Sequence, residues 1–334
     1  MVDGSPPSVT VLICTRNRAA LLPRTLDSLA RVHVPPSWAW DVLVVDNGSS
    51  DGTWQIVAEK SRTYPVPLRC RFEAQPGKSA AMNAGVKATR SRVIACVDDD
   101  VLVCPGWLLS GCAPLLEDSS PYAYTGGPVE PVWEARRPEW FPTTRDDLWG
   151  TVAILDYGPD SFVFEDARRV PLGANVAFRR DLVENAGGFV TALGRSNSRI
   201  LLGQELPEFF RRTRTLGARG LYVPEMRVAH WVPSARMTRS YFRRWWFGKG
   251  VSRARVDRLH PVTELGLDLR AVRHFAGVPR FMFGDLLRDL GSWARAMTAG
   301  DRVAAMHRQT RACYFAGYFW ERMRRGRRSD AVAS

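Results

Sequence analysis

Residues 93–100 read Val93-Ile94-Ala95-Cys96-Val97-Asp98-Asp99-Asp100. A short apolar run that is rich in β-branched residues and bounded by polar ones is typical of a buried strand. Three consecutive carboxylates end this run, and adjacent carboxylates repel one another unless a cation compensates their charge. The stretch therefore predicts either a divalent cation held by oxygen ligands at the end of a core strand, or an acidic turn exposed to water.

Upstream of this stretch, the pattern of strand, polar loop and helix occurs three times. Apolar runs cover residues 9–14, 40–45 and 68–73, and a helical pattern follows each of them. Such alternation predicts an α/β fold with a mostly parallel, Rossmann-like sheet and helices on both faces, in which ligands bind at the carboxyl ends of the strands. The residues that follow these predicted strand ends are Arg16, Asp46, Lys78 and the cluster Asp98, Asp99 and Asp100.

Two common nucleotide-binding motifs are excluded because this sequence lacks glycines that they require. Gly77-Lys78-Ser79 resembles the end of a P-loop, but a P-loop has a glycine five residues before Gly77, where this chain has Phe72. No GxGxxG sequence follows the first predicted strand, as a nicotinamide dinucleotide site would require.

Four motifs stand at the predicted strand ends: residues 10–18, 46–53, 77–85 and 98–100. In residue type, order and spacing they resemble the nucleotide-sugar motifs of glycosyltransferase family 2, and the resemblance spans about residues 9–250. It implies a GT-A fold that binds a nucleotide-diphosphate sugar and transfers the sugar with inversion. The implied donor is UDP-, GDP- or dTDP-linked, and the acceptor is a glycan, a lipid-linked molecule or a small natural product.

The same resemblance assigns roles to individual residues. Asp46 would accept a hydrogen bond from the base, Asp98 would bind the ribose hydroxyls, and Asp100 with His230 would ligate Mg²⁺ or Mn²⁺ at the diphosphate. Asp46 also suits a tight turn, because Asp-Asn-Gly-Ser is favourable turn chemistry, and a lone histidine such as His230 is often structural. The residues expected to bind the nucleotide sugar are Thr15, Arg16, Asn17, Arg18, Asp46, Lys78, Asp98, Asp99, Asn175 and Arg236.

The segment that would carry the general base departs from the family pattern. The family reads Gly-Glu-Asp-x-Glu-Phe or a Glu-Glu variant, whereas residues 203–209 read Gly-Gln-Glu-Leu-Pro-Glu-Phe. Glu205 falls on an acidic position of the family pattern whether the segment is aligned at Gly203 or at Glu208-Phe209. It is therefore the predicted base that takes the proton of the acceptor hydroxyl. Glu208 is the alternative, and both carboxylates could instead only favour a helix N-terminus through its dipole. Because Leu206 replaces the usual Asp, a family member that binds the donor without transferring its sugar stays an alternative.

The C-terminal part has a different composition. We expect a catalytic domain over residues 1–240, with a nucleotide-sugar half at about 9–104 and an acceptor half at about 120–240, and a basic, aromatic helical extension over 241–334. A strand is predicted over residues 122–129, and a strand pair or a strand and turn within 221–231. Helices are predicted over 272–297 and after an N-cap at Asp301. The aromatic residues within 131–166 suit either acceptor stacking or packing of the loop itself.

Net charge and cysteine usage narrow the class of protein. The 47 Lys and Arg against 34 Asp and Glu give a net charge of +13, which indicates an anionic partner. The six cysteines form neither a CxxC pair nor a zinc spacing, and no apolar run approaches the ~18 residues that span a bilayer. We therefore expect a cytoplasmic protein with reduced thiols, no signal peptide and no assigned oligomeric state.

Three partners or activities remain open beside the glycosyltransferase. A basic amphipathic extension suits the surface of an anionic membrane, but it also suits packing on the catalytic domain or on a second subunit. A nucleotidyltransferase of similar fold would use the same strand-end Asp and metal and would release pyrophosphate. A nucleic-acid-binding protein, which we do not expect, would bind through the basic C-terminus with strong salt dependence.

Overall fold

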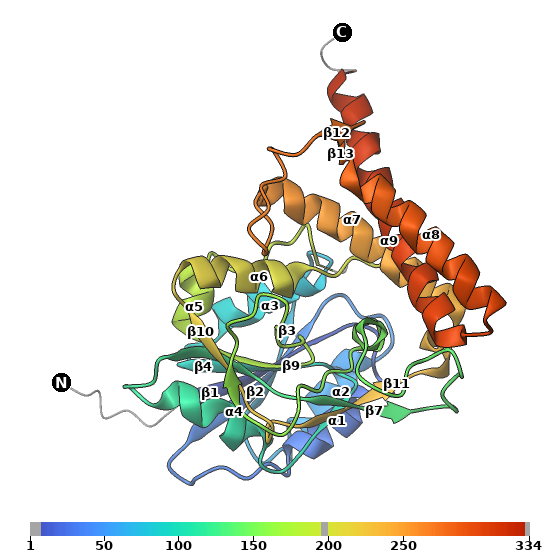
Figure 1. Cartoon of the computed structure of the whole chain (residues 1–334). Coiled ribbons are helices and arrows are strands. Elements are labelled where there is room, and N and C mark those ends of the chain that lie inside the picture. Colours follow the sequence, from blue (N-terminus) through green and yellow to red (C-terminus); the bar gives the residue numbers. More distant parts are fainter. Residues whose placement is uncertain (1–7, 195–199, 331–334) are drawn as a thin grey trace. The chain divides into compact units, whose positions relative to one another are not determined.

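The computed structural model describes residues 8–194 and 200–330, the last six of these by their backbone only (Figure 1). The chain divides into two compact units. The first unit comprises Met1–Val132, Ala153–Thr191 and Glu205–Trp231, and the second comprises Trp133–Val152, Ala192–Gln204 and Val232–Ser334.

An eight-stranded sheet forms the centre of the first unit. Its strand order is β3-β2-β1-β4-β9-β6-β10-β8, and only β9 and β8 run antiparallel to their neighbours. The predicted α/β fold with a mostly parallel sheet is therefore confirmed. The strands are β1 (Ser8–Thr15), β2 (Ala39–Asp46), β3 (Leu68–Phe72), β4 (Val93–Val97), β6 (Tyr122–Gly126), β8 (Phe162–Val163), β9 (Asn175–Arg179) and β10 (Arg219–Tyr222).

Helices cover both faces of this sheet because the strands bury side chains on both faces. Along β1, Val11 and Ile13 belong to one apolar cluster and Leu12 to another, as expected from the two-residue period of a strand. The first cluster includes residues of α1 (Leu22–Leu29) and α4 (Trp107–Leu116). The second includes residues of α3 (Lys78–Ala88), α5 (Arg180–Asn185) and α6 (Glu205–Thr215), while α2 (Thr53–Lys60) links β2 to β3.

A three-stranded sheet continues from the acidic cluster. Its order is β5-β11-β7, with β5 (Val101–Val103), β11 (Val228–Val232) and β7 (Val129–Trp133). Both segments within residues 221–231 form strands, but they do not pair with each other, because β10 joins the large sheet while β11 pairs with β5. The predicted strand over 122–129 is broken at Gly127, where the backbone passes so close to the carbonyl of Met226 that a Cβ atom would overlap it.

The second unit is mainly helical. Its long helices are α7 (Arg239–Leu259), α8 (Phe281–Thr298) and α9 (Arg302–Asp330), drawn in orange to red in Figure 1. The backbones of α7 and α9 approach closely at two glycines, since a Cβ atom on Gly250 would overlap the carbonyl of Tyr314 and one on Gly317 that of Phe247. The predicted N-cap is confirmed, because Asp301 Oδ1 accepts a hydrogen bond of 2.9 Å from the Ala304 amide.

Shorter elements complete the second unit. The helix predicted from residue 272 instead begins at Phe281, after a hairpin of β12 (His274–Phe275) and β13 (Val278–Pro279). Ala276 and Gly277 turn this hairpin with positive φ angles of 48° and 75°, and Pro279 disfavours a helical residue before it. Two 3₁₀ helices, η1 (Asp147–Val152) and η2 (Ser234–Arg236), also belong to this unit.

Aromatic residues of the loop after β7 pack against α7. The rings of Trp140 and Phe141 lie 4.9 and 5.8 Å from that of Phe242, and Trp246 Nε1 donates a hydrogen bond of 3.0 Å to Thr151 Oγ1. Packing of the loop itself therefore accounts for these aromatic side chains. Over the described part of the chain, we find no helix with the length and apolar character needed to cross a bilayer.

Candidate active site

The carboxyl ends of β1, β2 and β4 lie side by side in the first unit, and polar side chains tie their loops together. Thr15, the last residue of β1, donates a hydrogen bond of 2.7 Å from Oγ1 to Asp99 Oδ2 beyond β4. The Asn47 amide beyond β2 donates to the Thr15 carbonyl at 2.9 Å. Residues that are remote in sequence therefore share one edge of the sheet, as parallel topology requires.

The three aspartates after β4 have different surroundings. Asp98 is half-buried and accepts from Lys78 Nζ at 2.5 Å, whereas Asp99 and Asp100 are buried. Arg18 approaches both buried carboxylates, with Nε 3.5 Å from Asp99 Oδ1 and Nη2 3.6 Å from Asp100 Oδ2. Burial and the charge of Asp100 nevertheless raise the pKa of Asp99 to about 7. The site therefore carries negative charge that its own cations compensate only in part.

His230 on β11 faces the same carboxylates. Its ring is almost fully buried, and Nε2 lies 3.4 Å from Asp100 Oδ1. The Trp231 amide donates to the Asp100 carbonyl at 2.9 Å, which fixes β11 against this residue. A carboxylate oxygen and an imidazole nitrogen in adjacent positions are donors that suit a divalent transition metal. Over the described residues, no group of three or more His, Cys, Asp or Glu could hold a metal, so other ligands would have to come from a substrate or water.

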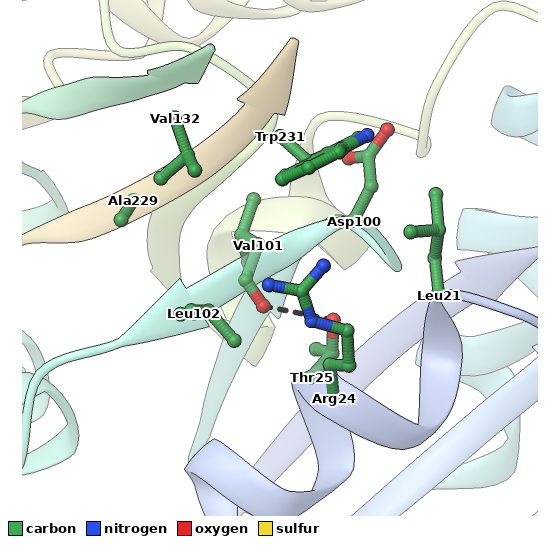
Figure 2. A pocket seen from close by; sticks show the side chains of 9 residues that line it. All are labelled: Leu21, Arg24, Thr25, Asp100, Val101, Leu102, Val132, Ala229 and Trp231. Atoms are coloured by element: carbon green, nitrogen blue, oxygen red, sulfur yellow. Dashed lines mark hydrogen bonds between the residues drawn. The ribbon is translucent and has the colours of Figure 1, made fainter. Parts of the chain in front are cut away.

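A small pocket is lined by Asp100 together with residues of α1, β5 and β11 (Figure 2). Thr25 of α1 donates a hydrogen bond of 2.8 Å to the Val101 carbonyl, and the guanidinium of Arg24 lies 5.0 Å from the centre of the Trp231 ring. These contacts hold the residues that follow Asp100 and His230. The helix α1 therefore contributes to the relative position of the two candidate ligands.

A more open pocket lies at the end of β2, beside Asp46. Asp46 Oδ1 accepts from the Ser49 amide at 2.9 Å, so this carboxylate forms the predicted turn. Trp54 and Phe72 line the same pocket and are 45% and 59% exposed. Sequence reasoning missed these two aromatic side chains, whose flat faces suit stacking with a base. The signal was a large aromatic residue next to each of two strand ends, since Trp54 directly follows the motif 46–53 and Phe72 ends the strand before the motif 77–85.

The two candidate bases at the start of α6 differ in their partners. Both oxygens of Glu208 accept from Arg212, from Nε at 2.6 Å and from Nη2 at 2.9 Å, and Arg212 also donates to the Gly188 carbonyl at 2.7 Å. Glu205 is buried, and its Oε2 has no hydrogen-bond partner. Glu208 is therefore part of a structural ion pair, whereas one buried oxygen of Glu205 accepts no hydrogen bond.

Glu205 lies close to the acidic cluster. Its charge and, more strongly, that of Asp98 raise the pKa of the Lys78 ammonium against the opposing effect of burial. Gly173 lies between α6 and Lys78, because a Cβ atom there would lie 2.5 Å from Leu206 Cδ1 and 3.3 Å from Lys78 Nζ. The residue at 173 must therefore be small for α6 to approach Lys78.

Three further predicted site residues differ in their surroundings. Asn175 is fully buried, and its side chain accepts from Trp107 Nε1 and donates to the carbonyls of Pro128 and Met226, at 2.6–2.9 Å. Arg236 belongs to the second unit, in η2. Arg16 is exposed beyond β1.

Asn17 shapes the loop after β1. It has a φ of +53°, its amide donates to Ser49 Oγ at 2.9 Å, and its Oδ1 accepts from the Ser50 amide at 2.8 Å. The loops after β1 and β2 are therefore braced against each other through this residue.

Comparisons with known proteins agree with this architecture. The sequence profile described as "Glycosyl transferase family 2" matches residues 10–186. The chain is 27% identical over 258 residues to a glucosyl-dolichyl phosphate glucuronosyltransferase of Haloferax volcanii, covering 76% of this chain and 78% of that protein. It is 32% identical over 110 residues to a beta-monoglucosyldiacylglycerol synthase of Trichormus variabilis, covering 32% of this chain and 23% of that protein.

A solved structure has a similar fold. It is a mannosyltransferase of Pyrobaculum calidifontis in complex with GDP-Man and Mn²⁺, and the alignment covers 98% of this chain and 86% of the other. The TM-score is 0.54 and the identity is 20%. This similarity identifies the GT-A fold.

Proposed function

Because the chain belongs to glycosyl transferase family 2 and is thus a glycosyltransferase, we propose that it transfers a sugar, with inversion, from a nucleotide-diphosphate sugar to an acceptor hydroxyl. The observation that carries this proposal is the convergence of Asp98, Asp99 and Asp100 with Lys78 and His230 at one sheet edge. Oxygen and nitrogen ligands beside a fixed ammonium form a site for a metal-bound diphosphate.

We propose Asp100 and His230 as the ligands of a divalent cation. Their adjacent oxygen and nitrogen atoms fit such an ion, and the incompletely compensated charge near Asp99 favours one. A nitrogen ligand favours Mn²⁺ over Mg²⁺, which prefers oxygen ligands and water. When bound, the cation would neutralise charge on the departing diphosphate. The hydrogen bond from Trp231 to Asp100 and the support from α1 keep both ligands in place.

The donor nucleotide would lie along the ends of β1, β2 and β4. Asp46 with the exposed rings of Trp54 and Phe72 forms a suitable surface for the base. Asp98 would accept from the ribose hydroxyls while it holds Lys78 in place. Thr15 and Arg18 hold Asp99 and Asp100 and so act on the donor through these carboxylates.

Glu205 is the proposed general base. The acceptor oxygen forms a bond to the anomeric carbon, the bond from that carbon to the diphosphate oxygen breaks, and the hydroxyl proton passes to the carboxylate. A single displacement of this kind inverts the anomeric configuration. The support for Glu205 over Glu208 is that Glu205 Oε2 has no partner, whereas both oxygens of Glu208 are bound to Arg212.

A lipid-linked acceptor is favoured among the three acceptor classes. The names of the two relatives include a dolichyl phosphate and a diacylglycerol. These molecules belong to those proteins, and they suggest which acceptors to test first. The donor sugar and base are proposed only as a UDP-, GDP- or dTDP-linked sugar.

The donor site is tested by calorimetric titration with UDP, GDP and dTDP, each with and without Mn²⁺. We expect one nucleotide to bind the unmodified chain in a Mn²⁺-dependent way, and Asp100→Asn to remove that dependence. The matched control is Asp118→Asn, an exposed carboxylate of the same unit that pairs with Arg92, and it should bind normally. Absence of Mn²⁺-dependent binding of all three nucleotides would overturn the proposed metal site.

The reaction class is tested by product analysis. A glycosyltransferase releases a nucleoside diphosphate, whereas a nucleotidyltransferase of similar fold releases pyrophosphate. Release of pyrophosphate from the bound donor would overturn the proposed transfer of a sugar.

A further inference from the structure

The net positive charge of the chain is confined to its C-terminal third. Residues 232–334 contain 21 Lys and Arg against 8 Asp and Glu, whereas residues 1–231 contain 26 of each. The net charge of +13 therefore belongs entirely to the segment that begins inside β11 and includes α7, α8 and α9. Such a field attracts an anionic surface.

The helix α8 is amphipathic, and only part of its apolar side is covered by the second unit. Met282, Leu286 and Phe283 pack into the apolar cluster of the second unit. Beside these packed residues the helix exposes large apolar side chains: Leu290 and Met297 follow Phe283 at intervals of seven residues, and Leu287, which is 69% exposed, lies next to them. This exposed apolar surface, here called the outer face of α8, is suited to a further apolar partner. The exposed apolar residues are Phe281, Leu287, Leu290 and Met297.

Arginines border this apolar face. Arg288 and Arg295 are exposed along its edge, while Asp285 is half-buried beside Arg288 at 2.7 Å and Asp289 is buried between Arg308 and Arg311. No Asp or Glu is therefore exposed along Phe281–Thr298, all of which the structure describes. The surface combines large aliphatic side chains with two exposed guanidinium groups, of which Arg288 pairs with Asp285 and Arg295 donates a hydrogen bond to Ser292.

The hairpin before α8 extends the same surface. Phe275 is 63% exposed, and its ring centre lies 5.8 Å from that of Phe283 on α8. Arg322 of α9 holds the hairpin by donating a hydrogen bond of 2.7 Å to the Gly277 carbonyl. Arg273 and Arg280 are exposed at either end of the hairpin. An apolar tip between two basic residues suits insertion at the level of lipid headgroups.

We propose that the outer face of α8 and the tip of the 274–279 hairpin bind the surface of an anionic lipid bilayer. The apolar side chains enter the boundary between headgroups and acyl chains, and the arginines contact the anionic headgroups. The helix lies in the plane of the membrane, because the charges of Arg288 and Arg295 oppose its crossing. This inference does not depend on the proposed activity.

Two other occupants fit the surface less well. A two-fold contact with a second copy would bring together the exposed arginines of both copies, and Asp285, which already pairs with Arg288, is the one carboxylate of α8 that is not buried. A nucleic acid would match the charge, but it has no apolar surface for Leu287, Leu290 and Met297. A bilayer with anionic lipids satisfies both features together.

The inference is tested by sedimentation of the full chain with vesicles of phosphatidylcholine alone or with 30% phosphatidylglycerol. We expect binding only to the anionic vesicles, weakened by salt. Leu287→Gln with Leu290→Gln, and separately Arg288→Gln with Arg295→Gln, should each lower the apparent affinity by roughly tenfold or more. The matched controls, Leu109→Gln with Leu216→Gln and Arg31→Gln with Arg62→Gln, change exposed residues of the first unit and should bind as the unmodified chain does.

Several results would overturn the inference. These are absence of binding to anionic vesicles, unchanged binding by the double leucine variant, or a dimer in sedimentation velocity that this variant converts to a monomer. The last result would assign the face to a second copy of the chain. Vesicle binding is measured without donor, so it can succeed where transfer fails, and the failure of one proposal is distinguished from that of the other.

Discussion

The opposite surroundings of Glu205 and Glu208 predict opposite effects of the same substitution. Glu205→Gln should remove turnover and leave the fold stable, whereas Glu208→Gln should destabilise the fold. The two residues lie one helical turn apart on α6 and are both buried. Each substitution therefore serves as the control for the other, since both replace a buried carboxylate by an amide of equal size.

The expected loss of stability follows from the contacts of Glu208. Removing one partner of a buried ion pair costs about 3–5 kcal/mol. Arg212 keeps its bonds to the carbonyls of Ala186 and Gly188, its side chain is 23% exposed, and glutamine retains one acceptor oxygen. We therefore expect a smaller cost of about 2–3 kcal/mol, which lowers the Tm by roughly 4–10 °C.

The effect of Glu205→Gln is expected on the rate. Because Oε2 has no hydrogen-bond partner, its replacement should change the free energy of unfolding by less than about 1 kcal/mol. Loss of a general base should lower kcat by about 10²- to 10⁴-fold and leave the Kd for the nucleoside diphosphate unchanged.

Thermal unfolding and initial rates at saturating donor and acceptor test both variants. A Glu205→Gln enzyme with the unmodified rate would refute the assignment of the base. A Glu208→Gln enzyme with an unchanged Tm and no turnover would transfer that role to Glu208.

Three further predictions concern the core and the second unit. Asn175→Ala should lower the free energy of unfolding by about 3–5 kcal/mol, because it leaves three buried groups without their partner; an unchanged Tm with weaker nucleotide binding would instead support a role for Asn175 at the donor. Gly317→Ala should cost about 1–3 kcal/mol in a urea titration, since the new methyl group meets the Phe247 carbonyl, and Gly291→Ala, which points into open space, is the control that should not destabilise. Burial raises the pKa of Cys96 to about 12, so its thiol stays protonated at pH 8 and should resist iodoacetamide until the chain is unfolded; rapid alkylation of the native protein, followed by mass spectrometry, would contradict this.

Local patterns were sufficient to predict the central sheet and one edge of the site. The apolar runs before residues 15, 46 and 98 are strands, and their parallel order places Thr15, Asp46 and Asp98 at one sheet edge. This follows from sequence because parallel strands joined by helices have their carboxyl ends on the same side. The N-cap at Asp301 was predictable for a similar reason, since capping involves residues three apart.

Contacts between remote segments decided the rest. Asn175 was predicted to bind the donor and Glu205 to act as the base, yet the Asn175 amide is enclosed by Trp107, Pro128 and Met226, while one carboxylate oxygen of Glu205 has no partner. The choice between Glu205 and Glu208 depends on Arg212 and on the carbonyls that orient it.

The same holds for the secondary structure that sequence reasoning misplaced. The separate sheets of β10 and β11 depend on their partners β6 and β5, about a hundred residues earlier in the chain. The sequence by itself determined which segments become strands and helices around the site, because periodicity and turn chemistry act over a few residues. Only the tertiary structure decided which polar side chains are used to hold the fold and which are left available, because that depends on partners brought together by folding.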